Sequence, residues 1–189
     1  PGPGIHSSSG GSLQGFDWNL HNNSEQGLFI DSATVVVDGI TTSNNGFSGV
    51  HTFDARYIRL SNLSSVGDGA LGGNEMDQAG LSYQKSNDLE TTSGDVACMD
   101  CRIESPQGHG VYVIDSVDLW LDNLSISDVD SSLPAMYVNN GGLTLGTQGG
   151  RFNLLNANIE HESTTEYALY IEQAAGNIDA LTLIGNHSG

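Results

Sequence analysis

The segment "GVYVIDSVDLWLDNLSIS", residues 110 to 127, contains two short stretches in which apolar residues occupy every second position. A period of two is typical of β-strands, because successive side chains of a strand point to opposite faces. Asp115 and Ser116, which separate the two stretches, favour a turn. The segment therefore predicts two short strands joined by a tight connection.

The same pair of stretches recurs along the chain. Copies of the first stretch are "GLFI" at 27, "GVHT" at 49, "GLSY" at 80, "GVYV" at 110, "AMYV" at 135 and "ALYI" at 168. Copies of the second are "VVVDGITT" at 35, "IRLSNLSS" at 58, "ACMDCRIES" at 97, "LWLDNLSIS" at 119, "LLNANIEHE" at 154 and "LTLIGN" at 181. Insertions of different lengths separate the copies, as loops between the strands of a solenoid do.

These repeats predict an all-β solenoid of about six to seven stacked coils. We expect residues 13–189 to form this domain and residues 1–12 to be a flexible or extended segment. Because the exposed end of such a stack presents core residues and strand edges, we also expect the domain to be part of a longer assembly. A leucine-rich repeat is the alternative fold, but its L-x-x-L-x-L pattern is missing.

On these repeated stretches the chain resembles the right-handed parallel β-helix proteins of the pectin-lyase-like superfamily, most of all viral tailspikes and surface β-helices. The resemblance implies a right-handed, single-stranded parallel β-helix. It also implies either polysaccharide cleavage or adhesion to glycans. Gly108-His109-Gly110 matches a polygalacturonase motif with a functional histidine, but the paired Asp motifs and the Arg-x-Lys motif of those enzymes are absent.

Alignment of the copies predicts which side chains face the interior. In the first strand the inward columns are Leu28, Val50, Leu81, Val111, Met136 and Leu169, then Ile30, Thr52, Tyr83, Val113, Val138 and Ile171. In the second strand they are Val37, Leu60, Met99, Leu121, Leu155 and Leu183, then Ile40, Leu63, Ile103, Leu124 and Ile159.

Between the inward columns of the first strand lies an outward column rich in aromatic residues. Its members are Phe29, His51, Ser82, Tyr112, Tyr137 and Tyr170. A flat aromatic ladder, flanked by Gly27, Gly49, Gly80, Gly110, Ala135 and Ala168, suits sugar rings, whose C–H faces pack on aromatic faces. We therefore expect Phe29, His51, Tyr112, Tyr137 and Tyr170 to bind carbohydrate. The alternative is that this face is covered by another subunit, by a loop or by its own packing.

A second outward column is expected to carry Val36, Arg59, Cys98, Trp120, Leu154 and Thr182. Monomers rarely expose a contiguous apolar stripe. We therefore expect Val36, Trp120 and Leu154 to form a subunit interface, in a homo-trimer.

Two pairs of acidic residues are candidates for chemistry. Glu104 and Glu160 follow equivalent apolar positions two coils apart, with Ser125 on the coil between, so their backbones should lie about 9.6 Å apart. Such a pair is a candidate acid and base of a glycosidase. Asp100 and Asp122 are expected at one turn position on adjacent coils, where they are candidates to share a Ca²⁺ ion or to point into solvent.

Polar repeats and cysteines suggest structural roles. Asn62 and Asn123 precede an inward leucine at equivalent turn positions, which favours an Asn turn, although both also start glycosylation sequons. Cys98 and Cys101 form a lone C-x-x-C, and no second pair completes a zinc site, so we interpret them as structural cysteines.

Charge excludes some functions. The formal net charge is −18, with 23 Asp and Glu against 5 Lys and Arg, so a cationic footprint for nucleic acid is missing. No apolar run is long enough to insert in a membrane.

The composition favours an extracellular or virion-surface protein, in one interpretation from a halophilic system. We expect a surface adhesin that binds host-surface polysaccharide or glycoprotein. The alternatives are an extracellular polysaccharide hydrolase or lyase and a structural spacer.

Salt should strengthen folding steeply, because counterions screen the repulsion among the carboxylates. The urea midpoint, followed by circular dichroism, is expected to rise between dilute buffer and molar KCl or NaCl. A midpoint that does not change with salt would remove the argument for a halophilic system.

Overall fold

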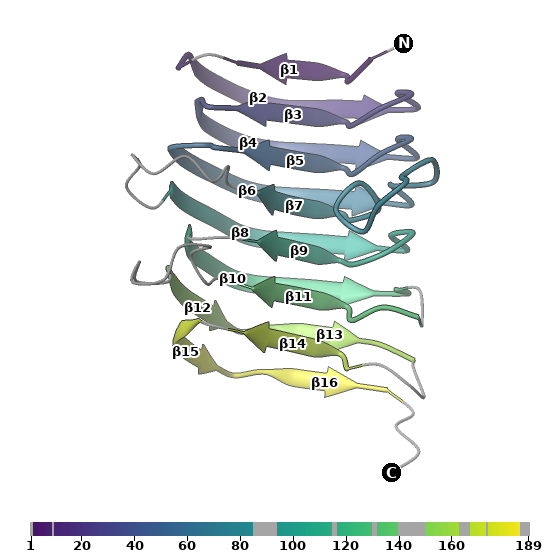
Figure 1. Cartoon of the computed structure of the whole chain (residues 1–189), viewed down its shortest axis with the longest axis vertical. Helices are drawn as coiled ribbons and strands as arrows, with labels where there is room; N and C mark the ends of the chain where they lie inside the picture. Colours follow the sequence, from purple (N-terminus) through teal and green to yellow (C-terminus); the bar gives the residue numbers. More distant parts are fainter. Residues whose placement is uncertain are drawn as a thin grey trace.

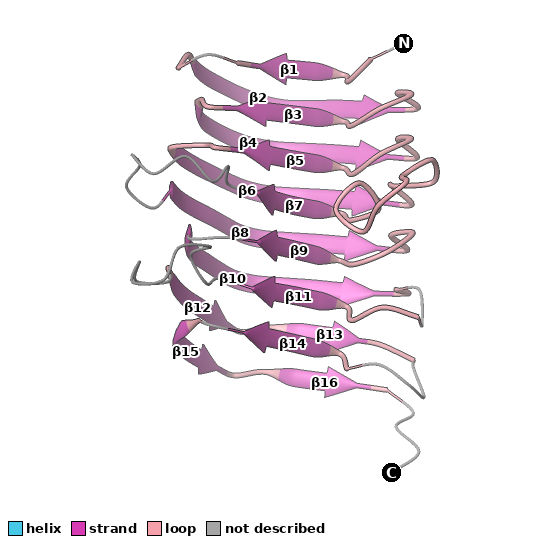
Figure 2. Cartoon of the chain, viewed as in Figure 1, coloured by secondary structure: helices cyan, strands magenta, loops and turns pink. Residues whose placement is uncertain are grey.

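The computed structural model describes residues 2–8, 10–84, 94–114, 117–129, 132–139, 150–162, 167–172 and 174–185. These residues form strands and turns and no helix (Figure 2). Within the same ranges there is accordingly no helix that is long and apolar enough to cross a membrane. The expected all-β class is therefore confirmed for the described part of the chain.

The strands form two sheets, and the chain passes from one to the other and back (Figure 1). The seven-stranded sheet contains β1 (Ile5–Ser7), β3 (Leu28–Asp31), β5 (Val50–Phe53), β7 (Leu81–Gln84), β9 (Val111–Ile114), β11 (Met136–Asn139) and β14 (Leu169–Glu172). The nine-stranded sheet contains β2 (Ser12–His21), β4 (Thr34–Ser43), β6 (Tyr57–Val66), β8 (Gly94–Glu104), β10 (Val117–Ser127), β12 (Arg151–Leu155), β13 (Asn158–Glu160), β15 (Ala175–Asp179) and β16 (Thr182–Ile184).

Every strand pairing in the two sheets is parallel, and each strand pairs with the strand that follows on the next pass. We call one pass through both sheets a coil. Residues of one coil thus lie beside their counterparts in the next. The stack begins within residues 1–12, because Ile5 to Ser7 pair with Leu28 to Ile30.

The predicted inward columns of the first strand are confirmed in register. Leu28, Val50, Leu81, Val111, Met136 and Leu169 are consecutive partners. The column from Ile30 to Ile171 is paired in the same way. All but the last residue of each column is buried. Stacked apolar side chains of this kind supply most of the stabilisation, at about 25 cal/mol per Å² removed from water.

The predicted register of the second strand is wrong at two places. Leu60 and Leu121 pair with Cys98 rather than Met99, and Leu121 pairs with Leu154 rather than Leu155. Cys98 and Leu154 are fully buried. In both places two neighbouring residues are apolar, and a shift of one residue exchanges the two faces of a strand.

The second predicted column of this strand also divides into two. Ile40 pairs with Leu63, and Leu124 pairs with Cys101. Ile103 and Ile159 lie two residues further along, where both pair with Ile126. Leu183, predicted to be inward beside Leu155, pairs with Ile159 and is 49% exposed on the last described coil.

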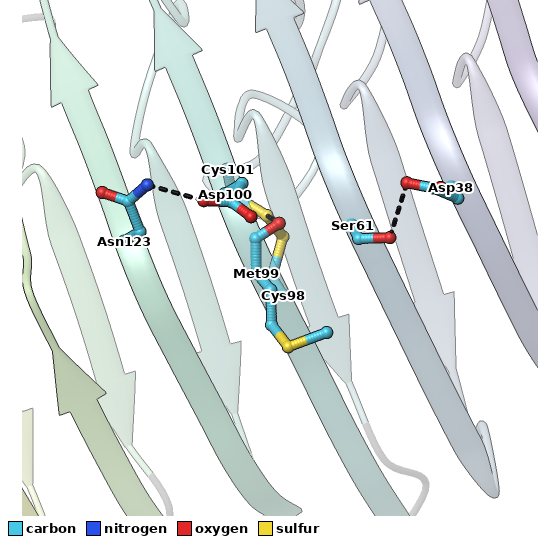
Figure 3. Close-up of a disulfide and its surroundings, with 7 residues drawn as sticks. All are labelled: Asp38, Ser61, Cys98, Met99, Asp100, Cys101 and Asn123. Carbon is cyan, nitrogen blue, oxygen red and sulfur yellow. Dashed lines mark hydrogen bonds between the residues drawn. A yellow bond between two sulfur atoms is a disulfide. The ribbon is translucent and has the colours of Figure 1, made fainter.

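Cys98 and Cys101 form a disulfide within β8, with their Cα atoms 6.1 Å apart (Figure 3). Both residues are buried. They take the two inward positions that Leu121 and Leu124 occupy on the next coil. The disulfide therefore replaces a pair of apolar side chains in the core, which agrees with the predicted structural role.

In the nine-stranded sheet each coil has one residue in the left-handed conformation, inside the long strands β2, β4, β6, β8 and β10 and between the short strands of the last two coils. These residues are Asp17, Gly39, Asn62, Asp100, Asn123, Asn156 and Ala180, with φ between 50° and 72°. Asn and Asp tolerate this conformation better than other residues with a side chain. Asn62 and Asn123 also donate amide hydrogen bonds to the preceding coil, to Asp38 at 2.7 Å and to Asp100 at 2.6 Å (Figure 3 shows the second). Asn62 and Asn123 thus occupy equivalent positions, as predicted, but these lie inside β6 and β10, and the amides bond carboxylates of the preceding coil.

The small residues before the first strands point into the interior, not outward as expected. A Cβ atom on Gly80 would lie 2.3 Å from Cγ2 of Ile103, and one on Gly110 would lie 2.5 Å from Cγ2 of Ile126. Ala135 and Ala168 at the same position are buried. The chain turns here and brings its backbone against the opposite sheet, which leaves no room for a larger side chain.

Replacement of Asn123 should separate the contribution of its amide hydrogen bond to stability from that of its left-handed backbone conformation. We expect Asn123→Ala to lower the free energy of unfolding by about 1–3 kcal/mol, because it loses a hydrogen bond and places Ala in the left-handed region. Asn123→Gly should lower the free energy of unfolding by less, since glycine adopts the left-handed conformation without steric cost. Urea denaturation measures both, with exposed Asn158→Ala as the control. An Asn123→Ala variant as stable as the control would contradict this role.

Candidate functional site

The predicted aromatic column lies on the outer face of the seven-stranded sheet, and its register is confirmed. Phe29, His51, Ser82, Tyr112, Tyr137 and Tyr170 are partners on six successive coils. His6, which the repeat alignment did not include, pairs with Phe29 and extends the column by one coil. Ser82 divides the aromatic residues into two groups.

The C-terminal group is a regular stack of three tyrosines. The ring centroids of Tyr112 and Tyr137 are 5.2 Å apart with an interplanar angle of 14°, and those of Tyr137 and Tyr170 are 5.2 Å apart at 4°. All three side chains are half-buried. Tyr167, 66% exposed, lies beside the end of the stack, 6.4 Å from Tyr170. We call Tyr112, Tyr137 and Tyr170 the tyrosine ladder.

The N-terminal group is less accessible. His6 and Phe29 have ring centroids 4.8 Å apart, and Phe29 and His51 are 5.2 Å apart. His51 is only 5% exposed, and its Nδ1 lies 3.1 Å from the hydroxyl of Ser82, which is also buried. The expected carbohydrate-binding role of His51 is therefore corrected, because its ring is not available to a ligand. Phe29 remains half-buried.

His109 supports the tyrosine ladder from the turn before β9. Its ring lies 5.0 Å from that of Tyr112 and 5.7 Å from that of Tyr137. His109 is buried, and its Nδ1 contacts the carbonyl oxygen of Pro134 at 2.5 Å. Burial lowers the pKa of His109, while the Pro134 carbonyl and the nearby Glu75 carboxylate oppose this. His109 is thus a packing residue under the ladder.

The segment that carries Glu75 joins β6 to β7 and is held by a buried carboxylate. Asp68 accepts hydrogen bonds from the Thr42 hydroxyl at 2.7 Å and the Ser65 hydroxyl at 2.8 Å. It also accepts two from Asn45, one from its backbone N–H and one from its side-chain amide, each at 2.9 Å. Burial raises the pKa of Asp68, and these four bonds act against that rise. The segment is thereby fixed, and Glu75 Oε2 lies 3.6 Å from His109 Nε2.

The other end of the ladder carries a carboxylate. The Tyr170 hydroxyl donates to Glu172 at 3.3 Å, and the Asn139 amide approaches the same oxygen at 3.5 Å. The Glu172 carboxylate raises the pKa of Tyr170, so the phenol stays protonated at neutral pH. The ladder therefore combines aromatic faces with a hydroxyl, an amide and a carboxylate at one end.

Glu104 and Glu160 lie two coils apart, as predicted, and each has its own set of neighbours. Glu104 pairs in register with Ser127, and not with Ser125 as the alignment predicted. Its carboxylate forms an ion pair with Arg102 at 2.8 Å. Glu160 lines a separate hollow of about 400 Å³ with Asp128, Val129 and Glu162.

Asp100 and Asp122 do not share a turn position. Asp122 pairs with Met99, whereas Asp100 has the left-handed conformation that Asn123 has on the next coil. Each carboxylate accepts an amide hydrogen bond, Asp100 from Asn123 and Asp122 from Asn156 at 3.0 Å. Among the residues that the structure describes, no group of three or more His, Cys, Asp or Glu is arranged to hold a metal ion. The shared turn position expected for Asp100 and Asp122 is therefore wrong.

The expected subunit stripe on the nine-stranded sheet is interrupted. Val36 and Trp120 do lie on the outer face, 36% and 45% exposed. Leu154 does not, because it is buried one position away from the outward Asn153, which pairs with Trp120. Ala97, rather than Cys98, is the outward partner of Trp120 on the preceding coil. The contiguous apolar stripe that predicted a trimer is therefore not present.

The tyrosine ladder presents the edges of three stacked rings next to the Glu172 carboxylate and the Asn139 amide. Neither family models, nor curated proteins, nor solved structures match this chain.

The buried His51 should make stability depend on pH. Burial lowers its pKa from 6.5 to about 4, so the folded state keeps it neutral while the unfolded state takes up a proton below about pH 6.5. Stability should therefore fall by up to about 3 kcal/mol between pH 6.5 and pH 4. Urea denaturation across this pH range should show that the free energy of unfolding falls less in His51→Gln than in the wild type. The same substitution at exposed His6 is the control, and equal pH dependence in His51→Gln and wild type would refute the assignment.

Proposed function

We propose that this chain is a right-handed, single-stranded parallel β-helix of a virion or cell surface, which binds host-surface glycans through the tyrosine ladder. The two sheets of parallel strands, visited alternately, support this form of the fold. The observation that carries the function is the parallel stack of Tyr112, Tyr137 and Tyr170 on an outer face.

The ladder suits an extended saccharide. The stacked rings present their edges and hydroxyls to solvent, so sugar C–H groups can pack along the ring edges and sugar hydroxyls can bond the tyrosine hydroxyls. Because the three rings are repeated along the axis of the stack at 5.2 Å, a chain that follows this axis would meet one ring after another. Tyr167 and Glu172 extend the contact surface at one end.

Charge narrows the class of glycan. With a net charge of −18, the chain repels polyanions over distances up to about 10 Å at 0.1 M salt. Glu172 at the ladder adds a local negative charge. The proposal therefore concerns neutral or cationic glycans rather than uronates or sulfated polysaccharides.

The proposed location is extracellular. The disulfide between Cys98 and Cys101 supports it, because disulfides persist in oxidising compartments and are rare in the cytosol. Homo-trimer assembly and a halophilic source stay predictions. Light scattering tests the first, and the salt dependence of unfolding tests the second.

A glycan array followed by titration tests the proposed binding. We expect retention of neutral or cationic polysaccharide and at least a tenfold loss of affinity in Tyr137→Ala, which removes the middle ring of the ladder. Phe16→Ala, which removes a 76% exposed ring on β2 of the other sheet, is the matched control and should bind normally. Absence of binding to every glycan, or binding unaffected by Tyr137→Ala in a folded variant, would overturn the proposal.

The same mixtures distinguish the enzyme alternative. Polysaccharide incubated with the chain should keep its length by size-exclusion chromatography. Shortened products that disappear in Glu160→Gln would instead establish a hydrolase or lyase.

A further inference from the structure

A second concave site lies on the outer face of the nine-stranded sheet. It has a volume of about 470 Å³ and is lined by Tyr57, Ile58, Arg59, Asp95, Val96, Ala97, Met99, Trp120 and Asp122. The residues come from β6, β8 and β10, on three successive coils. We call it the Ala97 hollow.

The hollow exists because one position of an outward column holds a small side chain. Arg59 pairs with Ala97, and Ala97 pairs with Trp120. Arg59 and Trp120 are therefore two coils apart, or about 9.6 Å between their backbones. On the seven-stranded sheet an outward column is filled by stacked tyrosines, whereas here the small Ala97 lies between the side chains of Arg59 and Trp120.

The walls of the Ala97 hollow determine the class of ligand. Trp120 is 45% exposed, and the guanidinium of Arg59 lies 5.9 Å from the centre of the Tyr57 ring. Asp95 precedes Ala97 by two residues on β8, and Asp122 follows Trp120 by two on β10. The Asn156 amide donates to Asp122 at 3.0 Å and so orients its carboxylate. An aromatic face, two carboxylate acceptors and a guanidinium donor thus surround one small residue.

We propose that the Ala97 hollow binds one neutral hexopyranose unit, stacked on Trp120. The carboxylates of Asp95 and Asp122 accept hydrogen bonds from ring hydroxyls, and Arg59 donates to a hydroxyl or ring oxygen. Neighbouring hydroxyls suit such acceptors and donors, because hydrogen bonds to charged groups are the stronger ones. An anionic sugar would meet two carboxylates, so a unit without negative charge fits, and a neutral hexopyranose uses both the acceptors and the donor of the site.

This site is separate from the proposed function of the tyrosine ladder. It lies on the other sheet and shares no residue with the ladder. Neither site therefore depends on the other, and their tests have independent outcomes.

Saturation-transfer NMR with methyl glycosides of glucose, galactose and mannose, followed by titration of tryptophan fluorescence, tests the proposal on the whole chain. We expect at least one glycoside to bind and to change the fluorescence. Trp120→Ala should lower the affinity at least tenfold, and so should Ala97→Leu, which fills the hollow while keeping the tryptophan. Gln14→Leu, in the same outward column three coils away, is the matched control.

Several results would overturn the inference. These are no binding of any neutral glycoside, wild-type affinity in a folded Ala97→Leu variant, or tighter binding of a glucuronide than of the neutral sugars. Loss of binding in Tyr137→Ala with none in Trp120→Ala would also place the sugar on the ladder alone. Loss in Trp120→Ala with none in Tyr137→Ala supports the Ala97 hollow whether or not the ladder binds glycans.

Discussion

The structure depends on the parallel register that places each residue beside its counterpart one coil away. A parallel ladder repeats every side chain at about 4.8 Å, so identical or similar residues stack in columns. Inward columns such as the one from Leu28 to Leu169 become the core. Outward columns become continuous surfaces whose character is set by one residue per coil. Function on such a scaffold is therefore a property of columns rather than of loops.

The left-handed residues hold this register in the nine-stranded sheet. Each coil changes direction in this sheet at one residue with positive φ, and at three of these residues, Asn62, Asn123 and Asn156, the amide donates to an Asp of the preceding coil. On β8 the disulfide spans this residue and fixes the two inward positions on either side. The direction change is thus stabilised by hydrogen bonds outside and by apolar or disulfide contacts inside.

The two candidate binding surfaces are both outward columns of the stack, but one is filled by large side chains and the other contains a small one. The tyrosine ladder fills three successive positions of an outward column with rings that stack on one another. The Ala97 hollow leaves one position empty between Arg59 and Trp120. On the tyrosine ladder a sugar would lie along the ring edges. In the Ala97 hollow it would lie between Arg59 and Trp120. Both depend on a rigid backbone, because the wall residues are held by strand pairing.

Much of this architecture follows from the sequence, and the exceptions have physical causes. The first strands are short and have one apolar pattern, so the sequence predicts their columns from Leu28 to Ile171 in register, including the order of the tyrosines, but misses β1 with His6. The predicted register of the second strands is wrong where Met99 follows Cys98 and where Leu154 precedes Leu155. Alternation alone does not show which of two adjacent apolar residues faces the interior. The burial of His51 depends on contacts that repeats do not encode. The Ala97 hollow depends on the corrected register, so sequence alignment missed it.

A crystal structure of the chain with a neutral oligosaccharide tests the central claim most directly, namely that outward columns recognise sugars. The account predicts sugar rings packed along Tyr112, Tyr137 and Tyr170, with a single pyranose between Arg59 and Trp120. Sugar bound elsewhere, with both columns bare at saturating ligand, would contradict it.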